Sequence, residues 1–269
     1  MKQEKIMVFI PMYNCENQIV RVLNQFDKKA RKFINEIVIV NNRSTDNGEK
    51  VAIEHINKIK GIKITVLRNK ENYGLGGSHK VAINYAIDHQ YDYLIVLHGD
   101  DQGSIQDIIP LLKNGEHKIN DCLLGARFCK GAELKGYSWF RTFGNKVYNI
   151  LFSLFSKKRI YDLGSGLNCY KVEQFYNPYY YKFPDDLTFN YCMVLANVHL
   201  KHKVSFFPLT WREDDQVSNV KLFSQAFRVL NILREFAINK PRFFQSEHRA
   251  IIFPAYESEV IAYSSEGKL

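Results

Sequence analysis

Residues 94–105 have the sequence LIVLHGDDQGSI. Four apolar residues run directly into His98, Gly99, two adjacent aspartates and a glutamine, and a Gly-Ser pair that can open a helix follows. A short apolar run of this kind predicts a buried strand. The carboxylates and the amide at its end indicate a place where polar chemistry is exposed. Whether other strands end in the same way decides the fold.

This strand is the fourth of a series. Apolar, β-rich runs occupy residues 6–10, 36–40, 62–67 and 92–97, and segments with helical spacing separate them. Strands that are apolar throughout and alternate with helices are typical of a mainly parallel sheet with helices on both faces. We therefore predict an α/β fold.

A polar cluster follows each of the four strands. The clusters are PMYNCEN, NNRSTDNG, RNKENYGLGG and HGDDQG, in chain order. In sheets of this type the ligand crevice lies outside the carboxyl ends of the strands. Each cluster alone is compatible with a loop of turn-forming Asn, Asp and Gly. Four clusters at one edge of the sheet predict a binding site there.

The second half of the chain is less regular. Strands are predicted at residues 121–128, 166–171 and 203–211, and helices at 137–158 and 187–200. No linker, repeat or low-complexity segment divides the chain. We predict one continuous domain, followed by a helical C-terminal segment.

Composition narrows the class of protein. The chain has 269 residues, of which 46% are hydrophobic and 14% aromatic, so it can bury an ample core. The net charge of +9 favours anionic partners such as phosphates, nucleotides or acidic lipid headgroups. Five scattered cysteines without CxxC spacing predict neither a disulfide framework nor a zinc site. The sequence shows neither the pattern of a signal peptide nor a run of about 20 apolar residues, so a cytoplasmic location is expected.

Six motifs occur in a characteristic order: IPMYNCENQI, VIVNNRSTDNG, NYGLGGSHKVAINYA, LHGDDQG, GARF and DLGSGLNCYK. This order resembles the family 2 glycosyltransferases of the GT-A fold, and it is most similar to the dolichol- or polyprenyl-phosphate sugar synthase branch. The resemblance covers roughly residues 5–222. It implies a GT-A fold, a nucleotide-sugar donor and Mg²⁺ or Mn²⁺ as cofactor.

The resemblance also implies the nucleotide contacts. The corresponding residues are Pro11, Tyr13, Glu16, Asn41, Asn42 and Ser44. The family often has an acidic pair that reads the base at the positions of Asn41 and Asn42. An amide still offers a donor and an acceptor to a base. Binding is therefore retained in principle, while the identity of the base becomes less certain.

LHGDDQG resembles the family's DADxQ metal and diphosphate motif. Asp100 and Gln102 match its second aspartate and its glutamine, so they are the expected ligands of the cation, and Asp101 is an additional acid beside the diphosphate. A hard divalent cation often bridges substrate phosphates through only one or two protein carboxylates. His98 replaces the first aspartate. It can hydrogen-bond the ribose or diphosphate when neutral, offset phosphate charge when protonated, or be structural.

The segment GARFCKGAELKGYSWFRTFGN resembles the acceptor segment of the lipid-phosphate synthases. It places Arg127 and Arg141 where that branch holds the acceptor phosphate, which suits their planar, bidentate guanidinium groups. Two solvated arginines are the alternative interpretation. A phosphate monoester is mostly anionic at neutral pH, so it can attack without a strong general base. The resemblance implies direct displacement at the anomeric carbon with inversion.

A sugar hydroxyl of a capsule, lipopolysaccharide or other surface glycan is the alternative acceptor, and it requires a general base. Asp185 and Asp186 lie where many family 2 members carry an acidic catalytic pair, although helix capping explains them equally well. Further along, Arg212 and Ser218 match positions that approach the diphosphate in the lipid-phosphate branch.

The C-terminal segment has apolar residues at helical spacing over 220–237, with basic residues between and beyond them. We assign residues 1–218 to a GT-A catalytic domain. Residues 219–269 are assigned to an amphipathic helix and tail that lies on a membrane surface, a partner or the core. The expected partners are the donor, a lipid-phosphate or glycan acceptor and the inner face of the membrane, with no nucleic acid. A homo-oligomer or a membrane partner protein stays open.

Two other classes of protein are compatible with parts of the pattern. A noncatalytic nucleotide-sugar-binding protein would explain the missing acidic residues at Asn41, Asn42 and His98. A nucleotidyltransferase usually has a glycine-rich basic loop behind the first strand, which PMYNCENQ lacks. An enzyme is favoured because Asp100, Gln102, Arg127 and Arg141 are present together.

Overall fold

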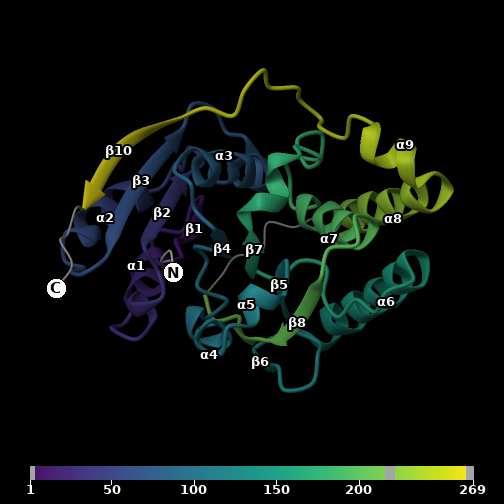
Figure 1. Ribbon diagram of the computed structural model, residues 1–269, viewed down its shortest axis with the longest axis horizontal. Coiled ribbons are helices and arrows are strands. Elements are labelled where there is room, and N and C mark those ends of the chain that lie inside the picture. Colours follow the sequence, from purple (N-terminus) through teal and green to yellow (C-terminus); the bar gives the residue numbers. More distant parts are fainter. Residues whose placement is uncertain (1–3, 216–221, 265–269) are drawn as a thin grey trace.

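The computed structural model describes residues 4–215 and 222–264 (Figure 1). An eight-stranded sheet runs through the molecule in the order β10-β3-β2-β1-β4-β7-β5-β8. Its strands are β1 (Ile6–Met12), β2 (Glu36–Asn41), β3 (Lys63–Asn69), β4 (Tyr93–Leu97), β5 (Cys122–Ala126), β7 (Leu167–Lys171), β8 (Val204–Pro208) and β10 (Ser258–Ser264). Strands β1 to β4 are parallel to one another, whereas β7 and β10 run antiparallel to their neighbours.

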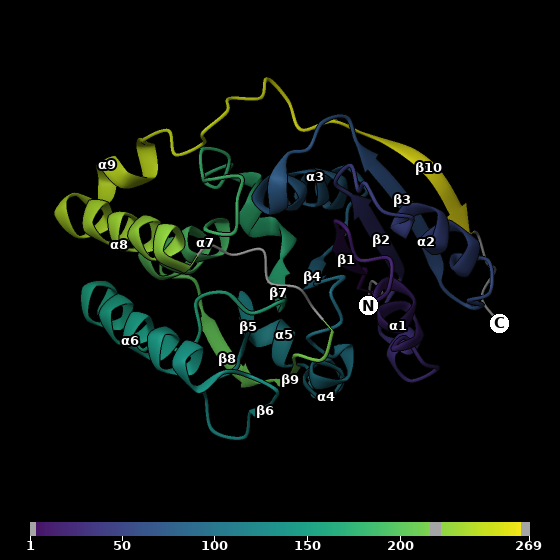
Figure 2. The ribbon, with the colours of Figure 1, turned by 180° about the vertical axis from the view of Figure 1, so that it is seen from behind.

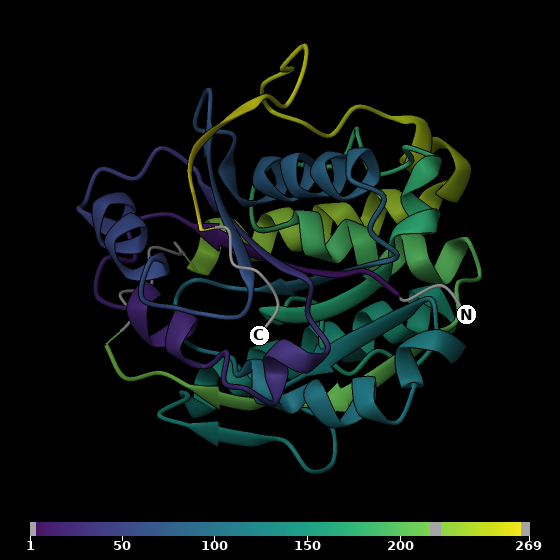
Figure 3. The same cartoon turned by 60° about the vertical axis from the view of Figure 1, so that its left-hand side comes forward.

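Helices cover both faces of the sheet because each central strand is apolar on both sides. Met7 and Phe9 of β1 pack with one set of helices, and Val8 and Ile10 pack with the other. The first set is α3 (Gly74–Asp88), α6 (Trp139–Ser156), α7 (Phe189–His199) and α8 (Leu222–Ile238). The second is α1 (Ile19–Asn24), α2 (Gly48–Ile56) and α4 (Ile109–Lys113). Figure 3 shows the two layers, with blue α3 above the strands and purple α1 below them.

Short elements complete the fold. They are α5 (Glu116–Ile119), α9 (Lys240–Gln245) and the 3₁₀ turns η1 (Ala30–Lys32), η2 (Ile105–Asp107) and η3 (Val172–Tyr176). A second, two-stranded sheet joins β6 (Glu133–Lys135) to β9 (Thr210–Arg212). The strand predicted at 203–211 is therefore divided. Its first part pairs with β5, and its second part leaves the main sheet to pair with β6.

The C-terminal part of the chain adds to the body of the molecule in two ways. The apolar face of α8, formed by Val229, Ile232, Leu233 and Phe236, is buried in the same core cluster as α3 and α7. Beyond α9, residues 246–257 form a crossing segment that leads to the far edge of the sheet (Figure 2). There β10 pairs with β3. The sequence pattern predicted β3 but not β10.

The α/β fold predicted from the sequence, with a mainly parallel sheet between two helical layers, is confirmed. Among the residues that the structure describes, no helix has the length and apolar character needed to cross a bilayer. Ser218 lies outside the described residues, so its predicted role has no structural counterpart here.

Candidate donor and acceptor site

The loops after β1 and β2 are joined by hydrogen bonds at the carboxyl edge of the sheet. The backbone N–H of Glu16 donates to Asp46 Oδ2 at 2.8 Å, and that of Asn47 donates to Glu16 Oε2 at 3.0 Å. Ser44 Oγ accepts from the backbone N–H of Asn14 at 3.1 Å. Tyr13 at the tip of the first loop is exposed. The predicted nucleotide residues Tyr13, Glu16 and Ser44 therefore lie in one place.

Asn41 and Asn42 are buried at the end of β2, and both amides are bound within the protein. The side chain of Asn41 bridges the backbone N–H of Ser44 and the carboxylate of Glu49. Asn42 Oδ1 accepts from the backbone N–H of Tyr73 at 2.9 Å, and its amide donates to Asn72. In this arrangement the two amides position the loops after β2 and β3. Their predicted contact with the base stays a prediction.

His98 follows β4 and lies against the backbone of Gly166. Its backbone N–H donates to Gly166 O at 2.9 Å, and a Cβ on Gly166 would approach the imidazole to 3.0 Å. Burial, with a smaller effect from the charge of Arg127, lowers the pKa of His98 to about 4. The imidazole is therefore neutral at pH 7. Its buried Nε2 has no hydrogen-bond partner in the part of the chain that the structure describes.

Gly99 brings the loop after β4 against the loop after β1. Its N–H donates to Pro11 O at 3.2 Å, and an added Cβ would lie 2.7 Å from the same oxygen. Only glycine permits this close approach. Pro11 and the Asp100–Gln102 segment consequently border the same crevice.

Asp100 and Asp101 have different surroundings. Burial, together with the charge of Asp101, raises the pKa of Asp100 to about 6. Asp101 is fully buried with a φ of 60°, and its carboxylate accepts from Arg21 Nε at 2.7 Å and from Gln25 Nε2 at 2.8 Å. Arg212 also pairs with this carboxylate, and its Nε donates to Asp101 O at 2.8 Å. The side chains of Asp101 and Arg212 thus bind each other, and their predicted contacts with the diphosphate stay predictions.

Glu213 links the two predicted parts of the site. Arg141 Nη1, from the first turn of α6, lies 2.7 Å from both carboxylate oxygens of Glu213. Gln102 Nε2 donates to Glu213 Oε1 at 3.4 Å. The guanidinium also lies over the ring of Tyr137 at 4.8 Å, and the side chain remains 31% exposed. Arg141 is therefore next to the Asp100–Gln102 loop and accessible to a ligand.

Arg127 has a different environment from Arg141. Its guanidinium donates to both carboxylate oxygens of Asp162, at 2.7 and 2.8 Å, and to Gly164 O at 3.2 Å. The side chain is only 8% exposed and lies over the ring of Trp211. Burial opposes its charge, but Asp162 outweighs burial and raises the pKa of Arg127. Arg127 is a buried anchor in this state, and its predicted contact with an acceptor phosphate stays a prediction.

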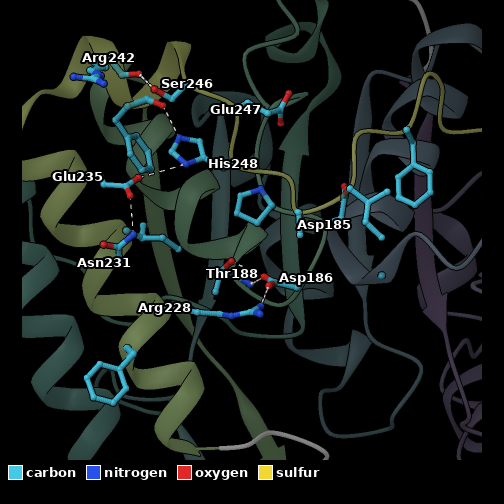
Figure 4. A pocket seen from close by; sticks show the side chains of 18 of the residues that line it. Asp185, Asp186, Thr188, Arg228, Asn231, Glu235, Arg242, Ser246, Glu247 and His248 are labelled. Atoms are coloured by element: carbon cyan, nitrogen blue, oxygen red, sulfur yellow. Dashed lines mark hydrogen bonds and ion pairs between the residues drawn. The ribbon is translucent and has the colours of Figure 1, made fainter.

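Asp185 and Asp186 lie before α7, on the wall of a cavity of about 1100 Å³ (Figure 4). Asp185 accepts from the buried Lys80 at 2.7 Å. Asp186 Oδ1 accepts from the backbone N–H of Thr188, the residue before α7, at 2.8 Å, and Oδ2 pairs with Arg228 of α8. The side chain of Asp186 is thus held by a turn contact and an ion pair without capping α7, and the catalytic interpretation stays open.

Several residues of the site were not singled out from the sequence. They are Asp162, Glu213, Lys80 and Arg228. In that order they form ion pairs with Arg127, Arg141, Asp185 and Asp186. Asp162 and Glu213 lie within or next to quoted motifs, so their charge was a usable signal. Nothing local identifies Lys80, because its partner is more than 100 positions away.

A divalent cation fits beside Asp100. Burial and the neighbouring Asp101 disfavour the negative charge of Asp100, and a bound cation would favour it. Within residues 4–215 and 222–264, no group of three or more His, Cys, Asp or Glu converges as a complete protein cage would. One or two carboxylates suffice for Mg²⁺ or Mn²⁺ that is shared with substrate phosphates.

The sequence profile described as glycosyl transferase family 2 matches residues 7–176, which is more than half of the chain. The chain belongs to glycosyl transferase family 2. The match begins in β1 and ends with η3, so it includes the loops that carry Glu16, Asn41 and Asp100. Asp186 and Glu213 lie beyond it. The family recognised from the order of motifs is confirmed.

Two curated relatives of this family 2 chain are named for lipid-phosphate acceptors. The undecaprenyl-phosphate 4-deoxy-4-formamido-L-arabinose transferase of Proteus mirabilis is 26% identical over 172 residues, which are 63% of this chain and 50% of that enzyme. The UDP-N-acetylglucosamine–dolichyl-phosphate N-acetylglucosaminyltransferase of Methanococcus voltae is 23% identical over 180 residues, covering 63% of this chain and 70% of that enzyme. The chain spans about half the length of the first relative.

Solved structures with the same fold include two sugar-nucleotide complexes. Glucosyl-3-phosphoglycerate synthase from Mycobacterium tuberculosis, bound to Mn²⁺, UDP-glucose and phosphoglyceric acid, has a TM-score of 0.61 at 14% identity, covering 87% of this chain and 80% of that one. S. aureus TarS 1–349 with UDP-GlcNAc has a TM-score of 0.58 at 16% identity, covering 87% and 67%. At these identities the likeness shows the fold, and the predicted GT-A class is confirmed.

Proposed function

We propose that this protein transfers a sugar from a nucleotide-sugar donor to a lipid phosphate. The observation that carries the proposal is the connection from Gln102 through Glu213 to Arg141, at distances of 3.4 and 2.7 Å. It joins the predicted diphosphate loop to an accessible arginine on a neighbouring helix. The names of the two curated relatives support a lipid phosphate as the acceptor.

The donor is proposed to lie along the carboxyl ends of β1, β2 and β4. Its nucleotide would contact the joined loops that carry Tyr13, Glu16 and Ser44. Its diphosphate would lie beside Asp100 and Gln102, which would hold Mg²⁺ or Mn²⁺. When bound, the cation neutralises charge that builds up on the departing diphosphate. The neutral His98 lies at the end of β4, two residues before Asp100.

The transfer is proposed to proceed with inversion. An oxygen of the acceptor phosphate attacks the anomeric carbon, the bond from that carbon to the diphosphate breaks, and the electron pair leaves with the nucleoside diphosphate. The attacking oxygen is already anionic at neutral pH, since the second pKa of a phosphate monoester is about 6. Arg141 holds the acceptor phosphate in line, and Glu213 fixes the guanidinium for that task.

A sugar hydroxyl is the second candidate acceptor. The observation in its favour is the cavity of about 1100 Å³ whose wall includes Asp186. A hydroxyl must lose its proton during attack, so this reaction would use Asp186 as general base. In the described state that carboxylate is bound to Thr188 and Arg228, which favours the lipid-phosphate proposal.

Lipid-dependent release of nucleoside diphosphate tests the proposal. Purified protein is incubated with a panel of nucleotide sugars, Mg²⁺ and a short-chain polyprenyl phosphate, and release is measured with and without the lipid. Arg141→Ala is expected to lower the rate on the order of 10²-fold or more with donor affinity near normal, because the acceptor loses its orientation. Asp186→Asn is expected to have a mild effect.

Two exposed residues provide matched controls. Arg234→Ala removes an arginine from the outer side of α8, and Asp88→Asn removes a carboxylate at the end of α3. Neither is expected to change the rate. An inactive Asp186→Asn protein beside a fully active Arg141→Ala protein would reject the lipid-phosphate mechanism in favour of a sugar hydroxyl. Donor binding without release of nucleoside diphosphate for any acceptor would indicate a noncatalytic protein.

A further inference from the structure

Helix α6 presents an apolar face to solvent. Its exposed aromatic and aliphatic side chains include Trp139, Phe140, Phe143, Ile150, Leu154 and Phe155. Trp139 is 79% exposed and Leu154 is 67% exposed. Most of these residues recur three or four positions apart, so they form one stripe along the helix, while Phe152 on the opposite side is buried in the core. Proteins rarely leave a stripe of this size uncovered.

Helix α6 and the three residues that follow it carry charges of one sign. Helix α6 contains no Asp or Glu, and its central Lys146 is exposed. Three more exposed cations, Lys157, Lys158 and Arg159, follow its last residue. Helix α8 lies beside α6 at the same end of the molecule, as Figures 1 and 2 both show. An apolar stripe with a basic border is typical of a helix that lies in a membrane interface.

A basic cavity of about 890 Å³ adjoins the C-terminal end of α6. Its cationic lining residues are Lys130, Lys158, Arg159 and Lys201, and among the residues that the structure describes no carboxylate lines it. Arg159 lies 4.8 Å above the ring of Tyr161, and that ring packs against Phe206 at 5.5 Å. The aromatic rings thus hold one guanidinium at the cavity. Several cations without a counter-charge attract a phosphate group.

We propose that α6 lies in the surface of an anionic lipid bilayer, with its apolar stripe among the acyl chains and the basic cavity holding a phosphate headgroup. The stripe and the basic residues favour this occupant together, because a neutral protein partner would need only the stripe. The inference rests on the proposed function only for the role of Arg141. The first turn of α6 carries Arg141, so a bilayer against this helix would bring a lipid phosphate to the proposed acceptor arginine.

Vesicle co-sedimentation tests the proposal, with neither donor nor polyprenyl phosphate present. Wild-type protein is expected to bind phosphatidylcholine vesicles that contain phosphatidylglycerol, and to bind pure phosphatidylcholine much more weakly. Phe143→Ser combined with Leu154→Ser is expected to weaken binding about 100-fold, from the loss of two inserted side chains. Lys158→Gln, Arg159→Gln and Lys201→Gln together are expected to weaken binding about 100-fold and to reduce its salt dependence, since each cation contributes about fivefold.

Matched variants at other places separate these effects from general changes of the surface. Val260→Ser with Tyr263→Ser removes two apolar residues, 59% and 67% exposed, from β10 at the opposite edge of the sheet from β8. Lys28→Gln, Lys29→Gln and Lys32→Gln remove three exposed charges near η1. Both control proteins are expected to bind vesicles as wild type does. Circular dichroism melting checks that all variants are folded.

Three outcomes would overturn the proposal. The first is unchanged vesicle binding by both the stripe and the cavity variants. The second is a dimer in solution that the stripe variant dissociates without any change in vesicle binding, which would assign the stripe to a second copy of the chain. The third is equal binding to phosphatidylcholine vesicles with and without phosphatidylglycerol, which would show that the basic cavity does not take part in membrane binding. Because no sugar transfer is measured, the outcome is independent of the proposed reaction.

Discussion

At the scale of single residues, Asp100 and Asp101 show how one backbone angle separates two roles. Asp101 has a φ of 60°, and its carboxylate forms ion pairs with Arg21 and Arg212. Asp100 instead remains at the crevice with a pKa raised to about 6 by burial and by its neighbour. Two identical side chains therefore become an anchor and a candidate cation ligand.

Asp100→Asn is expected to lower turnover on the order of 10²-fold or more, because the cation loses its charged protein ligand and the leaving diphosphate is less neutralised. Release of nucleoside diphosphate, measured over a range of Mg²⁺ concentrations, checks this. Asp88→Asn serves as the control. A wild-type rate for Asp100→Asn, or full turnover of the wild-type protein in EDTA, would contradict a catalytic cation at this place.

His79 predicts a pH dependence of stability. Its ring is buried between Phe9 and Phe189, and burial lowers its pKa to about 3. The unfolded chain takes up a proton on this histidine below about pH 6.5, while the folded protein does not, so acid favours unfolding. The penalty is absent above pH 6.5 and grows as the pH falls toward the folded pKa.

We expect the free energy of unfolding of the wild-type protein to fall by about 1.4 kcal/mol per pH unit more than that of His79→Phe below about pH 6. Urea unfolding at several pH values measures the two slopes. His89→Phe is the control, since His89 makes the same contact to a carbonyl four residues earlier but is exposed. Equal slopes for wild type and His79→Phe would show that the buried histidine does not carry this dependence.

At the scale of elements, the N-terminal turn of α3 determines where the Asp185–Asp186 loop lies. The backbone N–H of Gly76 donates to Asp185 O at 2.7 Å. A Cβ on Gly76 would lie 2.4 Å from Pro184 O and 2.8 Å from Phe189 Cβ. The helix and the loop are therefore in direct backbone contact, which only glycine allows.

Gly76→Ala is expected to lower the free energy of unfolding by about 1–3 kcal/mol, because the loop must move to admit the methyl group. Gly144→Ala in α6 is the matched control, since no atom lies within 4 Å of its added Cβ. That substitution is expected to be neutral or to stabilise by up to about 1 kcal/mol through helix propensity. Denaturant unfolding compares them, and equal stabilities of the two variants would refute the close packing.

At the scale of the whole molecule, the crossing segment ties the C-terminal part of the chain to the site. Tyr256 at its end donates to Asp185 Oδ1 at 2.8 Å and lies 3.0 Å from Lys80 Nζ. Its ring packs edge-on against Tyr73 at 5.3 Å. Burial lowers the pKa of Lys80 to about 8, although Asp185 supports its charge. The buried lysine thus depends on partners that are more than 100 positions away along the chain.

Tyr256→Phe is expected to lower the free energy of unfolding by about 1–3 kcal/mol, since the phenyl ring keeps its packing but Lys80 and Asp185 each lose the hydrogen bond to the hydroxyl. Thermal and urea unfolding measure the loss. Tyr263→Phe on the exposed side of β10 is the control and is expected to change stability by less than about 0.5 kcal/mol. A loss of the same small size in both variants would mean that the hydroxyl of Tyr256 contributes little.

Much of the fold was predictable because its signals are local. Apolar runs separated by helical spacing gave β1 to β4, and the polar clusters after them were correctly placed at one sheet edge. Strand β10 was not predicted, because it is an edge strand in which only Ser264 is buried and which shows no apolar alternation. Of the candidate site, the sequence led to Asp100, Gln102 and Arg141, which the structure brings close to one another through Glu213.

The sequence by itself determined the α/β class, the family and the edge of the sheet at which ligands would bind, since these follow from short-range periodicity and the order of motifs. Only the tertiary structure decided which charged groups are anchors and which are accessible. Arg127 and Asp162 are 35 positions apart, Arg141 and Glu213 are 72 apart, and Lys80 and Tyr256 are 176 apart. The environment of a charge depends on neighbours in space, and pairings over such separations form only when the whole chain has folded.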